Sequence, residues 1–181
     1  SYIGKPVFLG WLLLYALSTF AYSTFLKRIA VIDCFALAAL YSLRVVAGGE
    51  VSDIQPSFWL LVTSGFLFLS LAFGKRFAEI SLTEEDGRSD LAGRNYRTSD
   101  APVVLTFGVS SAFIAAMVLA LYVNSSAVTV LYRTPLAIWA TVPILLIWVC
   151  SLWFRLWRRE VSDDPVLFAL RDPISLLCGA A

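Results

Sequence analysis

The sequence predicts an all-α membrane bundle of about six transmembrane helices, and three observations lead to this fold class. First, 59% of the 181 residues are hydrophobic and only 15% are charged, whereas soluble chains carry about 25% charged residues. Second, the apolar runs approach the roughly 20 residues that cross a bilayer. Third, cations gather at the ends of alternate runs, at Lys27-Arg28, at Lys75 to Arg97 and at Arg155 to Arg159. This charge distribution is typical of a polytopic membrane protein.

The apolar runs place six spans along the chain, in one domain. They cover about residues 7–26, 29–48, 56–80, 101–123, 135–157 and 165 to the end. Only two or three residues join the first two spans, so we expect them to form a tight antiparallel pair. The last span is marginal because Arg171-Asp172-Pro173 interrupts it. The long hydrophilic stretch is the loop at about 81–100.

The positions of the cations predict the orientation. The loops near 27–28, 75–100 and 155–160 hold most of the Lys and Arg residues, whereas the opposite loops hold Lys5 and Arg133. By the positive-inside rule the cation-rich loops face the cytoplasm. We therefore expect a multi-pass protein of the inner (cytoplasmic) membrane whose active face is cytoplasmic.

The aromatic residues agree with this orientation. Trp11, Trp59, Tyr122 and Trp139 fall near the predicted outer ends of spans, and Trp153 and Trp157 fall near an inner end. Since Trp and Tyr favour the membrane interfaces, we expect these side chains at the two headgroup levels.

Composition also excludes some classes of chemistry. The chain has no histidine, which removes the commonest general base and zinc ligand. Cys34, Cys150 and Cys178 lie far apart in apolar runs and are expected to serve as packing residues. The net charge of +1 and the placement of the cations give no reason to expect a nucleic-acid partner.

Two ionisable residues, Asp33 and Arg44, fall inside the second span. A charge at the bilayer centre costs about 2.5–3.5 kcal/mol. The two residues are eleven positions apart, which places them on one helix face but roughly 16 Å apart along the axis. Each therefore needs a partner on another helix or a hydrated cavity. Alternatively, Asp33 is hydrated at the cytoplasmic boundary and Arg44 snorkels outward.

More charged residues follow at the inner end of the third span. Lys75 and Glu79 are at i and i+4 and share a helix face, which is also consistent with a simple surface ion pair. In the loop, Asp86 and Asp90 have a spacing that can hold Mg²⁺ if the segment is helical, although acidic loops are usually just solvated. Asp100 precedes Ala101-Pro102 and is a natural N-cap for the fourth span.

Seven blocks of residues, in order, resemble the UbiA superfamily of intramembrane prenyltransferases. They are Tyr22-Ser23-x3-Lys27-Arg28, Asp33-Cys34-Phe35, Tyr41-x-Leu43-Arg44-x2-Ala47-Gly48, Ser57-Phe58-Trp59, Lys75-Arg76-x2-Glu79, Gly93-Arg94-x-Tyr96-Arg97-x2-Asp100 and Asp163-Asp164-Pro165-x2-Phe168-Ala169-Leu170-Arg171-Asp172. The later blocks are most similar to the decaprenyl-phosphate phosphoribosyltransferase branch. The resemblance covers essentially the whole chain.

This resemblance implies a nine-helix fold around a cavity that opens near the cytoplasmic face. The six spans would then correspond to helices four to nine of that fold, so residues 1–181 would form a partial UbiA-like domain. The N-D-x2-D motif that the family uses to hold Mg²⁺ is absent from this sequence. We therefore expect either a fragment that lacks the first three helices or a degenerate product, inactive by itself.

The resemblance also assigns roles to the charged residues. Lys27, Asp33 and Lys75 are the expected catalytic residues. The residues expected to bind phosphate or diphosphate groups are Tyr22, Lys27, Arg28, Arg44, Lys75, Arg76, Arg94 and Tyr96. Glu79 and Asp100 are the expected Mg²⁺ ligands, ahead of Asp86 and Asp90.

The reaction implied is displacement of diphosphate from a carbon that becomes cationic. In the most similar branch, a polyprenyl phosphate attacks a phosphoribosyl diphosphate; in the quinone branch, an aromatic acceptor attacks a prenyl diphosphate. The partners are thus an isoprenoid lipid, a phosphorylated or aromatic co-substrate and the bilayer, with assembly into a homo-oligomer left open. A transporter segment, or a scaffold or anchor without catalysis, stays open as an alternative.

Overall fold

The computed structural model describes residues 6–52, 56–91, 93–125, 138–161 and 175. Over these ranges the regular structure is helical, apart from an isolated bridge between Asp90 and Arg97. The helices are α1 (Pro6–Thr24), η2 (Leu26–Arg28), α2 (Ile32–Val51), α3 (Phe58–Glu85), η3 (Thr98–Asp100), α4 (Ala101–Val123) and α7 (Thr141–Trp157). The predicted all-α membrane bundle is confirmed.

Within the described ranges, four helical segments are long and apolar enough to cross a membrane. They are Leu9–Arg28, Ile32–Glu50, Phe58–Glu85 and Thr98–Val123, and Thr141–Trp157 is a shorter apolar helix. These five segments correspond to the first five predicted spans. The sixth predicted span, from residue 165, lies outside the described residues except for Ser175, as do Lys5, Arg133, Cys178 and the block from Asp163 to Asp172.

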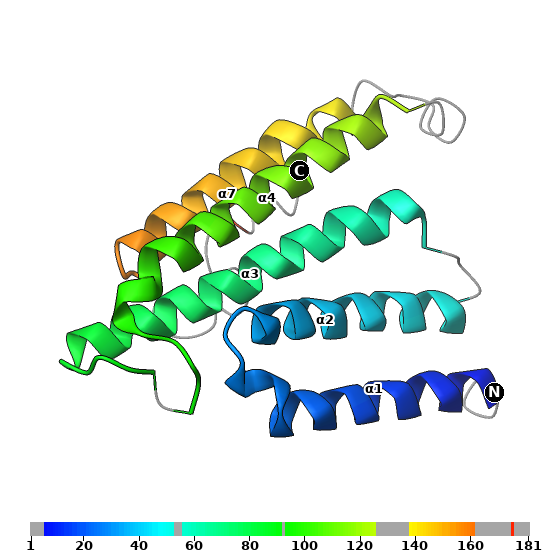
Figure 1. Ribbon diagram of the computed structural model, residues 1–181. Helices are drawn as coiled ribbons and strands as arrows, with labels where there is room; N and C mark the ends of the chain where they lie inside the picture. The colour runs from blue at the N-terminus through cyan, green and yellow to red at the C-terminus, as the bar shows by residue number, and fades with distance from the viewer. Residues whose placement is uncertain (1–5, 53–55, 92, 126–137, 162–174, 176–181) are drawn as a thin grey trace.

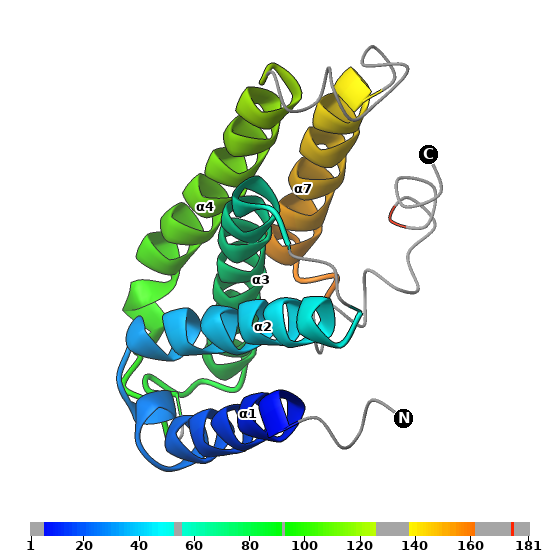
Figure 2. The ribbon, with the colours of Figure 1, turned by 90° about the vertical axis from the view of Figure 1, so that its right-hand side faces the viewer.

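The helices form two groups that meet at α3. α1 and α2 lie side by side and antiparallel, as predicted (Figures 1 and 2). α3 packs on α2 and on α4, and α7 packs on α4 and α3. Figure 1 shows that η2, the end of α3, the start of α4 and the end of α7 all gather at one end of the molecule. The three cationic stretches therefore lie at the same end, as the sequence predicts.

Helix α3 is longer than the predicted third span, because it continues beyond Ile80 to Glu85. Its 28 residues correspond to about 42 Å of helix, which exceeds the roughly 30 Å hydrocarbon thickness. The charged end of α3 can therefore project beyond the hydrocarbon, where its ions are solvated more easily.

A glycine ends α3. Gly87 has φ +69°, its N–H donates to the Glu84 carbonyl at 3.0 Å, and the Arg88 N–H donates to the Thr83 carbonyl at 3.1 Å. This pair of bonds is the Schellman arrangement that closes a helix.

The end of α3 bears on the expected Mg²⁺ site at Asp86 and Asp90, which requires a helical segment. These residues follow the helix and cannot share a helix face, so the condition for that site is not met.

The core lies where α4 presents small side chains to α3 and α7. The buried positions of α4 include Gly108, Ser111, Ala112, Ala115 and Ala116, and small residues allow close helix approach inside membranes. Trp153 of α7 fills the space beside Gly108 and donates from Nε1 to Ser70 Oγ at 3.1 Å. Trp153 is thus 5% exposed, because Gly108 leaves room for its ring in the core; its depth in the membrane stays a prediction.

Candidate functional site

The site is built around Asp33, a fully buried carboxylate in the first turn of α2. Its Oδ2 lies 2.7 Å from Arg76 Nε and 3.3 Å from Arg94 Nη1. Its Oδ1 accepts hydrogen bonds from the Tyr96 hydroxyl at 2.7 Å and from the Cys34 N–H at 2.9 Å. The sequence predicts that Asp33 needs partners, and these partners come from α3 and from the 86–100 loop. Among the residues that it describes, the structure shows no contact by which Asp33 would orient Lys27 or Arg28.

A second carboxylate completes the arrangement. Glu79 Oε2 forms ion pairs with Arg76 Nη1 and with Arg94 Nε, the latter at 3.4 Å. Asp33, Arg76, Glu79 and Arg94 together form what we call the charge cluster. It holds two acids and two arginines and is electrically neutral in its fully ionised form. This balance offsets part of the cost of burying Asp33 and Arg76, which are each 0% exposed.

Arg76 is only partly satisfied by the charge cluster. Its Nε lies close to Asp33 Oδ2 without the alignment of a hydrogen bond, and its Nη2 has no hydrogen-bond partner within the described part of the chain. Electrostatic attraction therefore holds this guanidinium more than directional bonding does. Buried donors without partners are uncommon, and they often mark functional sites.

Tyr96 joins the loop to the turn before α2. Its hydroxyl accepts from the Val31 N–H at 2.7 Å while it donates to Asp33. Burial raises the pKa of Tyr96 well above its ordinary value, so the hydroxyl stays protonated and continues to donate. The neighbouring Cys34 sulfur lies 3.7 Å from the same oxygen.

Val31 has an unusual backbone conformation at this point. Its φ of 70° and ψ of −49°, with the Ile32 N–H donating to the Ala30 carbonyl at 2.8 Å, define a γ-turn of the strained kind. For a β-branched residue this conformation costs about 1–3 kcal/mol. The bond to Tyr96 helps to hold it, and the turn directs the chain from Lys27-Arg28 into α2.

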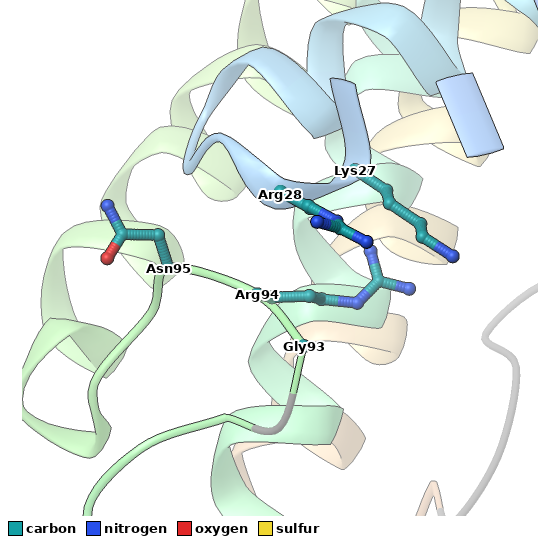
Figure 3. A pocket seen from close by; sticks show the side chains of 5 residues that line it. All are labelled: Lys27, Arg28, Gly93, Arg94 and Asn95. Atoms are coloured by element: carbon teal, nitrogen blue, oxygen red, sulfur yellow. The ribbon is translucent and has the colours of Figure 1, made fainter. Parts of the chain in front are cut away.

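A cavity of ≈590 Å³ opens beside the charge cluster and is lined by Lys27, Arg28, Gly93, Arg94 and Asn95. Figure 3 shows the side chains of Lys27 and Arg28, from η2, and of Arg94, from the loop before η3, extending in the same direction. Lys27 and Arg28 have no acidic partner among the residues that the structure describes. We call this cavity the cationic pocket. Its cations, and the fork geometry of its arginines, suit a phosphate group.

Most of the remaining predicted site residues lie near this end of the bundle. Lys75 is half-buried on α3 beside Arg76, and it does not line the cationic pocket. Tyr22 is half-buried on α1 and close enough to Arg76 to interact with it electrostatically. The structure therefore brings together Asp33, Arg76, Glu79, Arg94 and Tyr96, with Lys27 and Arg28 at the edge.

Arg44 stands apart from the site. Its Nε donates to the Tyr15 hydroxyl at 2.9 Å, and its guanidinium lies over the rings of Tyr15 and Tyr41 at 5.1 and 5.2 Å. The expectation that Arg44 finds a partner on another helix is confirmed. Its contacts give no support for a role in the cationic pocket.

Three of the four predicted Mg²⁺ ligands, Asp86, Asp90 and Asp100, lie outside the charge cluster. Asp100 accepts from the Arg97 N–H at 2.9 Å and makes no side-chain cap for α4, although it occupies the N-cap position. Asp86 pairs with Arg88 in solvent, and Asp90 pairs with Arg97 at 3.9 Å. Across the described ranges, no group of three Asp, Glu, Cys or His residues comes together. Asp33 and Glu79 each contact two arginines.

Several residues of the site had no role predicted from the sequence. Gly93 and Asn95 line the cationic pocket, while Val31 and Cys34 contact Tyr96. Gly93 carried a signal, since glycine is the usual residue where the backbone is left-handed, and its φ is +75°. Nothing in the pattern marked Val31, because its role depends on a backbone angle that valine rarely adopts.

Comparison with known proteins gives partial relatives, and no family model matches the chain. The uncharacterized protein y4nM of Sinorhizobium fredii is 34% identical over 167 residues, covering 92% of this chain and 32% of that protein. Nodulation protein NoeC of Azorhizobium caulinodans is 32% identical over 151 residues, covering 82% of this chain and 48% of that protein. Decaprenyl-phosphate phosphoribosyltransferase of Mycolicibacterium smegmatis is 40% identical over 67 residues, covering 37% of this chain and 21% of that protein.

The chain spans about a third of the length of the first relative, 32%, and about half of the second, 48%. The third match covers a shorter stretch, and its name describes a transferase that acts with a polyprenyl phosphate. The chain is therefore a membrane helical bundle with partial similarity to proteins named as a transferase, which supports a transferase-like enzyme at the family level.

Proposed function

We propose that the protein is an integral-membrane transferase of the UbiA type that acts on a polyprenyl substrate and displaces diphosphate. The reaction that we favour is transfer of phosphoribosyl from phosphoribosyl diphosphate to a polyprenyl phosphate. The single observation that carries this proposal is the cationic pocket, which opens directly beside the buried charge cluster. The partial similarity to a decaprenyl-phosphate phosphoribosyltransferase supports the choice of substrates.

The pocket suits the leaving group. When the bond from C1 of the ribosyl group to diphosphate breaks, the electron pair leaves with the diphosphate, and a polyprenyl-phosphate oxygen forms the new bond to C1. The negative charge that develops needs fixed positive charge nearby. Lys27 and Arg28, which have no acidic partner among the described residues, and Arg94 provide it at the mouth of the pocket.

The buried residues would then hold this arrangement. Asp33 binds Arg94 and Tyr96, which lie on the loop that forms one wall of the pocket. Mg²⁺ stays a prediction from the resemblance, and no step is assigned to it because Asp33 and Glu79 are already engaged with arginines. The role of Lys75 also stays a prediction.

The rest of the molecule suits a lipid substrate. Apolar helix faces extend from the charged end, and burial of an isoprenoid tail along them would contribute about 0.8 kcal/mol per CH₂. The proposal places the active face on the cytoplasmic side of the inner membrane, because the cationic stretches all lie at this end.

The test is a transfer assay with membranes that carry the natural protein containing this sequence. Labelled phosphoribosyl diphosphate should transfer label to the lipid extract when polyprenyl phosphate is supplied. Transfer instead from a labelled prenyl diphosphate to an aromatic acid would move the assignment to the quinone branch. Failure of both reactions would contradict the transferase proposal and favour a transporter or a scaffold.

Matched variants connect the activity to the pocket. Lys27→Gln and Arg28→Gln should each lower kcat/KM by about ten- to hundredfold, the loss expected for a charged hydrogen bond to substrate. Arg88→Gln is the control, because Arg88 is an exposed loop cation that pairs with Asp86 and does not line the pocket. Equal losses for all three variants would contradict the assignment of the pocket.

A further inference from the structure

Arg94 belongs to two sites at once. Its guanidinium lies 3.3 Å from Asp33 Oδ2 and 3.4 Å from Glu79 Oε2, and the same side chain lines the cationic pocket. Both distances exceed the roughly 2.7–2.9 Å of a strong charge-assisted hydrogen bond. The side chain is 21% exposed. The two carboxylates therefore hold Arg94 loosely, at the edge of a cavity that attracts anions.

Arg76, in contrast to Arg94, is held tightly by both carboxylates. It is fully buried, lies 2.7 Å from Asp33, and contacts Glu79 from the same helix at i and i+3. If Arg94 turns toward the pocket, Asp33 and Glu79 each keep Arg76 as a counter-ion. Departure of Arg94 thus leaves neither carboxylate without a cation, and the exchange avoids the large cost of an unpaired buried charge.

The backbone beside Arg94 permits such a movement. Gly93 has φ +75°, and apart from its chain neighbours no described residue has an atom within 4 Å of the position where a Cβ would stand. The loop around Arg94 is therefore not packed tightly on this side. Tyr96, two residues on, is buried and fixed by its bonds to Val31 and Asp33, so the guanidinium can move while the loop stays attached.

From these observations we infer that Arg94 is a shared arginine, which Glu79 holds at the edge of the cationic pocket until a phosphate group in the pocket takes it. Glu79 is then a positioning residue that acts through Arg94. This inference rests on the proposed function, because it requires that the pocket binds phosphate groups. It also implies that the Glu79–Arg94 ion pair lowers the affinity for the anion, since binding must first break that pair.

A double-mutant cycle tests the inference. The probe is inorganic diphosphate in metal-free buffer, titrated calorimetrically into the protein in lipid nanodiscs. Glu79→Gln should strengthen diphosphate binding by roughly two- to fivefold, the factor that corresponds to a part-exposed ion pair. In an Arg94→Gln background the same change should give no gain, because the residue through which Glu79 acts is missing.

Two further variants keep the result interpretable. Glu79→Asp keeps a negative charge for buried Arg76 and so protects the fold, yet it lengthens a contact to Arg94 that is already 3.4 Å; it should also strengthen binding. Glu84→Gln removes the same charge from the end of α3, where Glu84 pairs with Arg159, and should leave the affinity unchanged.

The possible results distinguish a failure of the Glu79–Arg94 inference from a failure of the proposed function. An equal gain from Glu79→Gln in both backgrounds would overturn the inference, since the effect would be a general electrostatic one. Weaker binding by both Glu79→Gln and Glu79→Asp would also overturn it. Absence of saturable diphosphate binding by the unmodified protein would contradict the proposed function itself.

Discussion

At the scale of single residues, Asp33 is the acid on which the contacts of the charge cluster converge. An acid inside a membrane-spanning helix requires compensation, and here two arginines and a tyrosine from distant segments supply it. The cluster is not a source of large net stability, because burying charges offsets most of their attraction. Its effect is to fix the loop that carries Arg94 and Tyr96 against the start of α2.

Removing the Asp33 charge should destabilise the protein strongly. Asp33→Asn leaves fully buried Arg76 with Glu79 as its remaining acid in the charge cluster, and breaking such a pair costs about 3–5 kcal/mol. The free energy of unfolding in mixed micelles measures this loss. Asp86→Asn is the control, since its ion pair with Arg88 is exposed and should change stability by at most about 1 kcal/mol. Similar losses for both variants would contradict this account.

Tyr96 should make the stability depend on alkaline pH. Burial raises the pKa of Tyr96 in the folded protein, whereas the unfolded tyrosine ionises near its ordinary value of about 10. The contribution of Tyr96 is therefore complete below about pH 10 and declines as the pH rises further, because the unfolded state then loses its proton first.

The measurement compares unfolding of the unmodified protein and Tyr96→Phe between about pH 9 and 11. The unmodified protein should lose stability more steeply, so the difference between the two curves should narrow as the pH rises above about 10. Tyr41→Phe is the control, because the contacts that the structure shows for Tyr41 are ring contacts with Phe68 and Arg44, which phenylalanine can keep. Parallel curves for Tyr96→Phe and the unmodified protein would show that Tyr96 does not titrate in this way.

At the scale of helices, the approach of α4 to α7 depends on one glycine. A Cβ at Gly108 would lie 2.2 Å from Trp153 Cζ2 and 3.0 Å from Phe73 Cβ. These distances are too short for real contacts, so a larger residue must move the Trp153 ring. The same ring donates to Ser70 of α3, so the displacement would affect all three helices of the core.

Gly108→Ala should therefore destabilise the bundle by about 1–3 kcal/mol, the usual effect of overpacking. Gly48→Ala is the matched control on another helix, because no atom of the described residues outside the adjoining helix backbone lies within 4 Å of its added methyl group. That change should be neutral or stabilising, since alanine favours helices. Thermal unfolding followed by circular dichroism in detergent measures both, and a neutral Gly108→Ala would contradict the packing described here.

At the scale of the whole molecule, the ends of the helices separate by charge. Lys27-Arg28, the end of α3 and the end of α7 gather at one end, and Arg159 joins two of these elements through ion pairs with Glu84 and Glu85. Arg159 has φ +60°, a conformation that places it at the close of α7. The opposite end brings Trp59 and Tyr122 together, with ring centroids 6.2 Å apart.

This separation predicts a topology that labelling can test. A membrane-impermeant maleimide should react with Ser89→Cys from the cytoplasmic side and with Ser52→Cys from the opposite side. Both positions are exposed, and the unmodified protein gives the background from its native cysteines. Labelling of both positions from the same side would contradict the bundle, and an exchange of sides would reverse the orientation.

The sequence alone determined the fold class, the first five spans and the end at which the cations gather. These properties depend on local composition, because length and apolarity decide whether a segment crosses a bilayer and nearby cations decide how it is oriented. The sequence also showed that Asp33 and Arg44 need partners, since an isolated ion in a span is costly.

Only the tertiary structure decided which partners they find. Asp33 meets residues 43 and 61 positions away, Arg76 and Arg94, and no local pattern encodes a pairing over such distances. The left-handed turn at Val31 and the close of α3 at Gly87 direct the chain so that two loops face each other. The pocket depends on that convergence, because the cations that line it come from segments that only folding brings together.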